Sequence, residues 1–225
     1  MHTVPDDSPS RLQDLTASEL VELGDAGLTF SLTEEEWRTV RAAAEAAQTA
    51  LAAGDTVYGV HTHYGHNVKN AADGADYAAH QRRLLDYLYV GVGPLFEAAT
   101  VRRALRLQCL KVAEGRSGVD PAVVEAVAEL SNGPCNHPVP SLGSLGASGD
   151  LIPMAHAVAP AVRKTGIRGP RDVIGLVNTN AMMSSVAVEQ LLRVRRLLEA
   201  VHEITAHVTV ALLTPPEHFS ADLFG

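Results

Sequence analysis

Aromatic residues are scarce in this chain, at 4% of 225 residues, although hydrophobic residues as a class reach 46%. Alanine, valine and leucine therefore supply most of the apolar content. A core of short aliphatic side chains favours packed helices over a β-sandwich. The length is enough for one large domain or two small ones.

Cysteine, positive charge and long apolar runs are also lacking. Cys109 and Cys135 are too few for a disulfide framework, which suits a reducing cytoplasm. The formal charge of −8 argues against a surface that binds nucleic acid. No apolar run approaches the roughly 20 residues of a membrane span, and the polar N-terminus does not resemble a signal peptide. We therefore expect a cytoplasmic protein that binds neither nucleic acid nor membrane.

The pattern of caps and apolar periods predicts an all-α fold. Residues 1–14 are predicted to be a disordered tail, followed by one domain over 15–225. Thr33 and Glu36 form a capping box at the start of a helix. Residues 28–32 form at most a small strand, and 132–149 are too rich in glycine and proline for regular structure. Helices are expected over 33–54, 77–90, 101–114, 121–130, about 150–166 and 184–213.

Residues 143–156, GSLGASGDLIPMAH, are a glycine-dense loop that runs into a helix N-terminus. Gly146 and Gly149 flank Ala147 and Ser148, so the backbone is free to bend tightly there. An ordinary turn or a phosphate-binding loop are the simpler interpretations. The phosphate interpretation lacks the lysine of a P-loop, and no strand pattern precedes the segment.

The same segment resembles the signature of the histidine, phenylalanine and tyrosine ammonia-lyases and aminomutases, the aromatic amino acid lyase family. The resemblance implies the helical fumarase/aspartase-like lyase fold and an α-amino acid substrate. It also implies that Ala147-Ser148-Gly149 cyclises without another enzyme into 4-methylidene-imidazol-5-one (MIO). The Gly149 nitrogen would attack the Ala147 carbonyl, two waters would leave, and the methylidene carbon from Ser148 would be the electrophile.

Residues 57–66, VYGVHTHYGH, resemble the loop of this family that carries the catalytic base. The resemblance implies that Tyr58 removes the β-proton, and that His61, His63 and Gly65 lie near the substrate. A free phenol ionises only near pH 10, so such a site must favour phenolate, for example with the positive ends of helices. The simpler interpretation is a loop tyrosine that packs its ring.

Two histidines in this loop depart from the family pattern. His63 replaces a glycine and His61 replaces a small polar residue, which adds bulk and titratable rings. Together with His66 they suggest a metal site. Their spacing matches no standard zinc pattern, and no cysteine or carboxylate accompanies them, so no metal is predicted.

Residues 80–94, HQRRLLDYLYVGVGP, resemble the family segment that contacts the substrate ring. The resemblance implies that Leu88 and Gly91 line the substrate site. Leu88 takes the place of the family histidine, which argues against recognition of a phenol or an imidazole, and Arg83 replaces an asparagine. The alternative is an amphipathic helix with Leu88 in the core.

Residues 175–181, GLVNTNA, resemble the family segment whose asparagine bonds to the MIO oxygen. The resemblance assigns that role to Asn178. The usual Gly-Thr pair after it is replaced by Thr179 and Asn180.

The resemblance extends from about Leu15 to Phe224, but family members are roughly twice as long. Their second half supplies further catalytic groups, and each of their active sites draws on several subunits of a tetramer. We therefore expect a split ammonia-lyase or aminomutase, in which a second polypeptide resembling the C-terminal half completes a hetero-oligomer. A specialised pathway such as secondary metabolism fits the unusual pocket residues. A non-catalytic interaction subunit and a truncated form of a longer protein are the alternatives.

Overall fold

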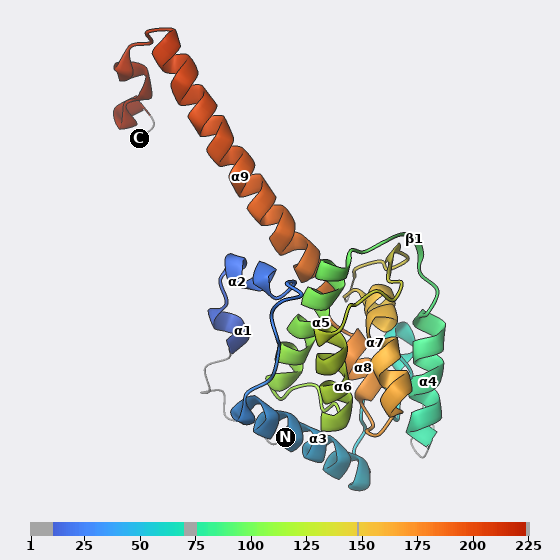
Figure 1. Ribbon diagram of the computed structural model, residues 1–225. Helices are drawn as coiled ribbons and strands as arrows, with labels where there is room; N and C mark the ends of the chain where they lie inside the picture. Colours follow the sequence, from blue (N-terminus) through green and yellow to red (C-terminus); the bar gives the residue numbers. More distant parts are fainter. Residues whose placement is uncertain (1–10, 70–75, 148, 224–225) are drawn as a thin grey trace. The chain divides into compact units, whose positions relative to one another are not determined.

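The computed structural model describes residues 11–69, 76–147 and 149–223. The chain divides into two compact units, Met1–Val186 and Ala187–Gly225. Helices dominate the described residues, which confirms the predicted all-α class (Figure 1). The α-helices are α1 Arg11–Asp14, α2 Ala17–Glu22, α3 Glu34–Ala52, α4 Tyr77–Leu88, α5 Ala98–Ala113, α6 Pro121–Asn132, α7 Leu151–Thr165, α8 Asp172–Val177 and α9 Ala181–Ala211.

Short-range sequence signals fix several helix ends. The capping box of Thr33 and Glu36 is present at the start of α3, where the Thr33 side chain accepts a hydrogen bond from the Glu36 amide. The Asp120 carboxylate caps α6, whose first residue is Pro121. Gly166 ends α7 with a φ of 76°, a conformation that suits glycine. These boundaries agree with the predicted ones.

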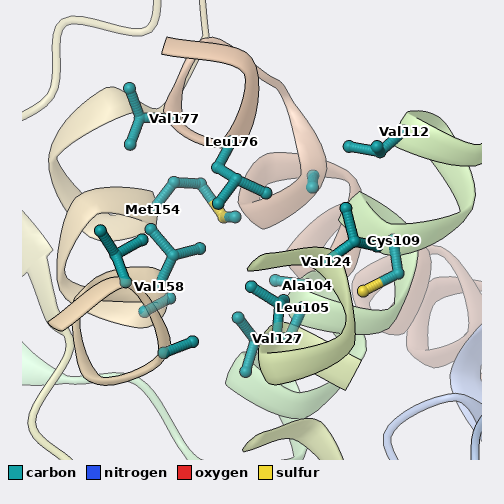
Figure 2. Packing of buried hydrophobic residues seen from close by; sticks show 14 of the residues in the cluster. Ala104, Leu105, Cys109, Val112, Val124, Val127, Met154, Val158, Leu176 and Val177 are labelled. Carbon is teal, nitrogen blue, oxygen red and sulfur yellow. The ribbon is translucent and has the colours of Figure 1, made fainter. Parts of the chain in front are cut away.

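The core of the first unit lies where α5, α6, α7 and α8 pack together. In Figure 1 these helices run side by side in the green-to-orange part of the chain, and α6 packs on both α5 and α7. Figure 2 shows Leu105 of α5, Val124 of α6 and Met154 of α7 pointing into one cluster, where each is fully buried. Burying a side chain of this size contributes roughly 1.5–3 kcal/mol. Leu176 of α8 joins the same cluster, which ties α8 to the core.

Buried arginines of α5 hold the N-terminal segment on this core. The Arg106 guanidinium is completely buried and donates to the carbonyls of Leu23, Asp25 and Leu28. Arg102 likewise donates to the carbonyl of Gly24. Backbone carbonyls accept from the terminal nitrogens of both guanidinium groups, whereas the two Nε atoms are buried without a partner. The chain before α3 is therefore fixed by hydrogen bonds as well as by apolar contact.

A two-stranded antiparallel sheet joins the two glycine-rich segments. β1 (Val92–Leu95) pairs with β2 (Pro140–Leu142), and Val92 lies opposite Leu142. β2 falls within residues 132–149, so the prediction that this segment holds no regular structure is wrong for these three residues. The pairing places the chain after α4 beside the chain before the Ala-Ser-Gly tripeptide.

The remaining predictions compare with the structure as follows, and the helix α2 (Ala17–Glu22) was not predicted. Residues 1–10 lie outside the described residues, but Arg11–Asp14 forms one helical turn, where a disordered tail was expected. No strand forms at residues 28–32. The short helix α8 was not predicted, because its six residues are too few to show a helical period. It precedes Asn178 and so positions one predicted site residue.

The second unit begins within α9, which has 31 residues. Apolar residues recur along this helix at a helical period, and their side chains are exposed. No helix among the described residues, α9 included, combines the length and the apolar content that crossing a membrane requires. The exposed residues are Leu191, Val194, Leu197, Leu198, Val201, Ile204 and Val208.

Candidate active site

The predicted Ala-Ser-Gly tripeptide lies in the turn that leads into α7. Ser148 lies outside the described residues, whereas Ala147 is exposed and Gly149 is buried. Gly149 has a φ of 131°, and Gly146 has a φ of 71°. The Ser144 hydroxyl donates to the Gly149 carbonyl over 3.3 Å. The turn thus adopts backbone conformations that only glycine takes without strain.

The turn between α8 and α9 lies in close contact with Gly149. A β-carbon added to Gly149 would lie 2.3 Å from the Thr179 carbonyl oxygen and 2.8 Å from the Thr179 carbonyl carbon. The amide of the next residue, Asp150, donates to the same oxygen over 2.8 Å. The Asp150 carboxylate in turn accepts from the Met183 amide over 2.7 Å. Two segments about 30 residues apart therefore grip the glycine end of the tripeptide.

Asn178 ends α8 directly before this turn. Its amide donates to the Ile174 carbonyl, and the residue is exposed. Asn178 is therefore one residue from Thr179, which contacts Gly149. The structure brings the predicted Asn178 and the predicted tripeptide to the same end of α8, and the bond from Asn178 to the MIO oxygen stays a prediction.

Tyr58 lies in a separate loop, which packs near the N-terminal end of α8. Its side chain is 37% exposed, its hydroxyl accepts from the Gly65 amide over 3.2 Å, and its ring meets that of Tyr64 edge to face. Arg171, just before α8, donates to the Tyr58 carbonyl over 3.3 Å and to the Ser117 carbonyl over 2.8 Å. Tyr58 and Gly65, both predicted site residues, are thus in direct contact.

The guanidinium of Arg171 also interacts electrostatically with Tyr58. Burial lowers the pKa of Arg171, whereas its interaction with Tyr58 acts in the opposite direction. Sequence reasoning did not identify Arg171. A lone arginine after a Gly-Pro pair carries no local pattern that would have identified it.

The histidines near Tyr58 differ in their contacts. His61 Nδ1 accepts from the Val57 amide, which fixes the loop locally. His63 meets the buried His80 edge to face at 5.4 Å, and Tyr64 stacks on His80 at 4.9 Å. Burial lowers the pKa of His80, with smaller contributions from His63 and Arg83. The described residues contain no group of three or more His, Cys, Asp or Glu that is arranged to hold a metal ion.

Leu88 and Gly91 lie where α4 ends and the chain turns toward β1. The Leu88 side chain is 6% exposed and belongs to the hydrophobic core, as in the alternative interpretation of this segment. The Gly91 amide donates to His156 Nε2 of α7 over 3.3 Å. A β-carbon at Gly91 would meet Pro140 and Ile152, so Gly91 lies close to the chain that flanks the tripeptide. Substrate contact by either residue stays a prediction.

The two groups of predicted residues lie at opposite ends of α8. The Tyr58 loop packs near Arg171 and Ile174, and the tripeptide turn contacts Thr179. Six residues of helix separate these ends by about 9 Å. Both segments therefore lie against α8 or the turns that flank it.

Lys111 of α5 is a further polar residue at this site. Its ammonium donates to Thr179 Oγ1 over 3.0 Å and to Asn180 Oδ1 over 2.7 Å. Burial lowers the pKa of Lys111, and Glu114 opposes that effect. Sequence reasoning missed Lys111, because it is a single lysine in an otherwise apolar turn of helix. Its partner Thr179 lies 68 residues further along the chain.

Fold and site together define a helical protein that presents an Ala-Ser-Gly tripeptide at the start of a core helix. A family model described as aromatic amino acid lyase matches residues 15–167, which is more than half of the chain. The chain therefore belongs to the aromatic amino acid lyase family.

Curated relatives and solved structures agree with this assignment. Histidine ammonia-lyase of Streptomyces coelicolor is 31% identical over 160 residues, covering 71% of this chain and 31% of that protein. Histidine ammonia-lyase of Geobacillus thermodenitrificans is 38% identical over 122 residues, covering 54% of this chain and 24% of that protein. The chain therefore spans well under half of the length of these relatives.

The solved structures show the same fold at lower identity. Phenylalanine aminomutase of Pantoea agglomerans superposes with a TM-score of 0.74 at 21% identity, over 84% of this chain and 40% of that one. Ergothionase from Treponema denticola superposes with a TM-score of 0.71 at 20% identity, over 84% of this chain and 42% of that one. The fold is thus the N-terminal part of the helical fold of these lyases and aminomutases.

Proposed function

We propose that this chain is the tripeptide-bearing subunit of an MIO-dependent ammonia-lyase or aminomutase that eliminates ammonia from an α-amino acid. The observation that carries the proposal is the close contact of the Thr179 carbonyl with Gly149, together with its hydrogen bond from the Asp150 amide directly before α7. An ordinary surface turn needs no such contact. A tripeptide that must close on itself does need one of its ends held in place.

The ring closure that we propose uses only atoms of this chain. The Gly149 amide nitrogen would form a bond to the Ala147 carbonyl carbon. The former carbonyl oxygen would leave as water with the hydrogens of the Gly149 and Ser148 amides, and a carbon–nitrogen double bond would form between Ala147 and Ser148. The Ser148 hydroxyl and its α-hydrogen leave as a second water, which creates the methylidene. The residues fit this step, because Ala147 is small and exposed, and Gly149 has no side chain to collide with Thr179. The start of α7 favours negative charge that develops on the ring.

The finished group would supply the electrophile that takes up the amine of the substrate. The proposed role of Tyr58 is to remove the β-proton. Asn178 would orient the tripeptide ring from the adjacent turn, and Gly91, His61 and His63 would line the substrate site. The products are ammonia and an α,β-unsaturated acid, or a β-amino acid if the ammonia adds back.

The active site also needs groups that the family carries in its C-terminal half. We propose that a second polypeptide resembling that half supplies them in a hetero-oligomer. One observation supports a partner: α9 exposes a row of apolar side chains. Exposed apolar surface of this extent is typical of an interface.

A non-catalytic interaction subunit is the second candidate. His63, Arg83, Leu88 and Thr179 depart from the family pattern, and Leu88 lies in the core. Such a subunit would use the apolar row of α9 to stabilise a lyase and would leave the tripeptide unreacted.

Intact-mass measurement separates the two candidates. The full chain, isolated from its own organism or co-expressed with the products of neighbouring genes, should be lighter than its sequence by two water molecules. Ser148→Ala should have its full sequence mass, since it lacks the hydroxyl that leaves. A full-mass wild-type chain in the assembled complex would contradict the lyase proposal and favour the interaction subunit.

A further inference from the structure

Lys111 connects the helical core to the turn that grips the tripeptide. Its ammonium donates to the side chains of Thr179 and Asn180, over 3.0 and 2.7 Å. Thr179 is 4% exposed, and its hydroxyl oxygen also accepts from the Ala181 amide over 3.2 Å. The Thr179 side chain is therefore held from two sides, by α5 and by the first residue of α9.

The backbone of Thr179 faces the tripeptide while its side chain faces Lys111. The carbonyl oxygen accepts from the Asp150 amide over 2.8 Å and lies against the α-carbon of Gly149. Side chain and carbonyl belong to one residue, so fixing the first restricts rotation of the second. Lys111 thus connects through one residue to the glycine whose nitrogen would attack.

We propose that Lys111 is a positioning residue that holds the Thr179 turn against Gly149 and thereby speeds closure of the tripeptide ring. This inference rests on the proposed function, because it concerns the bond from the Gly149 nitrogen to the Ala147 carbon and the loss of two waters. Lys111 takes part in no bond that is made or broken.

The surroundings of the ammonium indicate that removing it mainly affects geometry. Thr179 Oγ1 keeps its hydrogen bond from Ala181, and Asn180 is exposed, so water replaces the lost donor there. Neither oxygen is left buried without a partner. A neutral side chain at position 111 should therefore leave the fold intact while it loosens the turn.

The test measures ring closure over time in full-length chains under conditions where the wild type reacts. Lys111→Met keeps the length of the side chain and removes the ammonium, and Thr179→Val removes the oxygen that it binds. Intact mass gives the fraction of chains that have lost two waters at fixed times after a pulse of synthesis. The matched control is Lys164→Met, which removes an exposed lysine paired with Glu129 on the surface.

We expect Lys111→Met and Thr179→Val each to slow the loss of water by about tenfold, the value of one charge-assisted hydrogen bond. The double variant should slow the reaction by less than the product of the two single effects, because each single variant already lacks the contact between Lys111 and Thr179. Lys164→Met should react at the wild-type rate. Thr179→Val also supplies the answer if Lys111→Met fails to fold.

Three results would overturn the inference, and they are distinct. Wild-type rates in Lys111→Met or Thr179→Val remove the positioning role and leave the proposed function in place. Additive slowing in the double variant shows that the two residues act separately. A wild-type chain that never loses water refutes the proposed function, and the inference falls with it.

Discussion

Replacing Gly149 with alanine tests the contact on which the proposed active site depends. The new β-carbon would lie 2.3 Å from the Thr179 carbonyl oxygen, a distance at which backbone atoms must move. A φ of 131° adds strain of about 1–3 kcal/mol for a residue with a side chain. Overpacking against the rigid turn adds a further ~1–3 kcal/mol. We therefore expect Gly149→Ala to lower the free energy of unfolding by about 2–6 kcal/mol.

Gly143 offers a matched control a few residues earlier in the same loop. It has the same φ of 131°, but its added β-carbon would be 3.4 Å from the flexible end of the Ile152 side chain. Gly143→Ala should therefore cost the strain alone, about 1–3 kcal/mol. The effect of alanine on the unfolded chain is common to both variants and cancels in the comparison.

Denaturant unfolding followed by tryptophan fluorescence measures both variants. Trp37 is the single tryptophan, and it packs against the core of the first unit. Gly149→Ala should also retain its full sequence mass, although its amide nitrogen is still present, because the attacking atom is displaced. Equal destabilisation by the two substitutions would refute the account of a crowded Gly149.

Three further predictions follow from other parts of the structure. Arg106→Met should lower the free energy of unfolding by at least about 3 kcal/mol, because the carbonyls that accept from Arg106 lose their donor. Lys164→Met, at an exposed site, should change it by less than about 0.5 kcal/mol. Equal effects would contradict the stabilising role of the Arg106 hydrogen bonds. Burial lowers the pKa of His80 in the folded protein. As the pH falls below about 6.5, this histidine therefore binds a proton more readily in the unfolded chain than in the folded one, and the free energy of unfolding decreases. His80→Phe should therefore flatten the decline of the unfolding midpoint between pH 7.5 and 5.5 compared with wild type, and an unchanged slope would count against this assignment. Tyr58→Phe should reduce turnover by about 10²–10⁴-fold in the assembled enzyme and still lose two waters, since the base acts after ring closure; retained turnover would remove Tyr58 from its role.

The sequence alone determined the local features of this protein. The all-α class, the capping box at Thr33 and the starts of α6 and α7 follow from residues a few positions apart. The Ala-Ser-Gly tripeptide is likewise contiguous, so its resemblance to the lyase signature needed no structure. Such features are visible in sequence because caps and turns act within about one helical turn.

Only the tertiary structure decided which residues surround these features. The contact of Thr179 with Gly149, the reach of Lys111 to Thr179 and the contact of Arg171 with the Tyr58 loop join residues 30, 68 and 113 positions apart. The sequence allows Leu88 to line a substrate pocket or to lie in the core, because a leucine side chain suits both. Only the packing of the helices shows that Leu88 belongs to the core. Contacts of this kind arise when helices assemble, and no local period or motif encodes which side chains then meet.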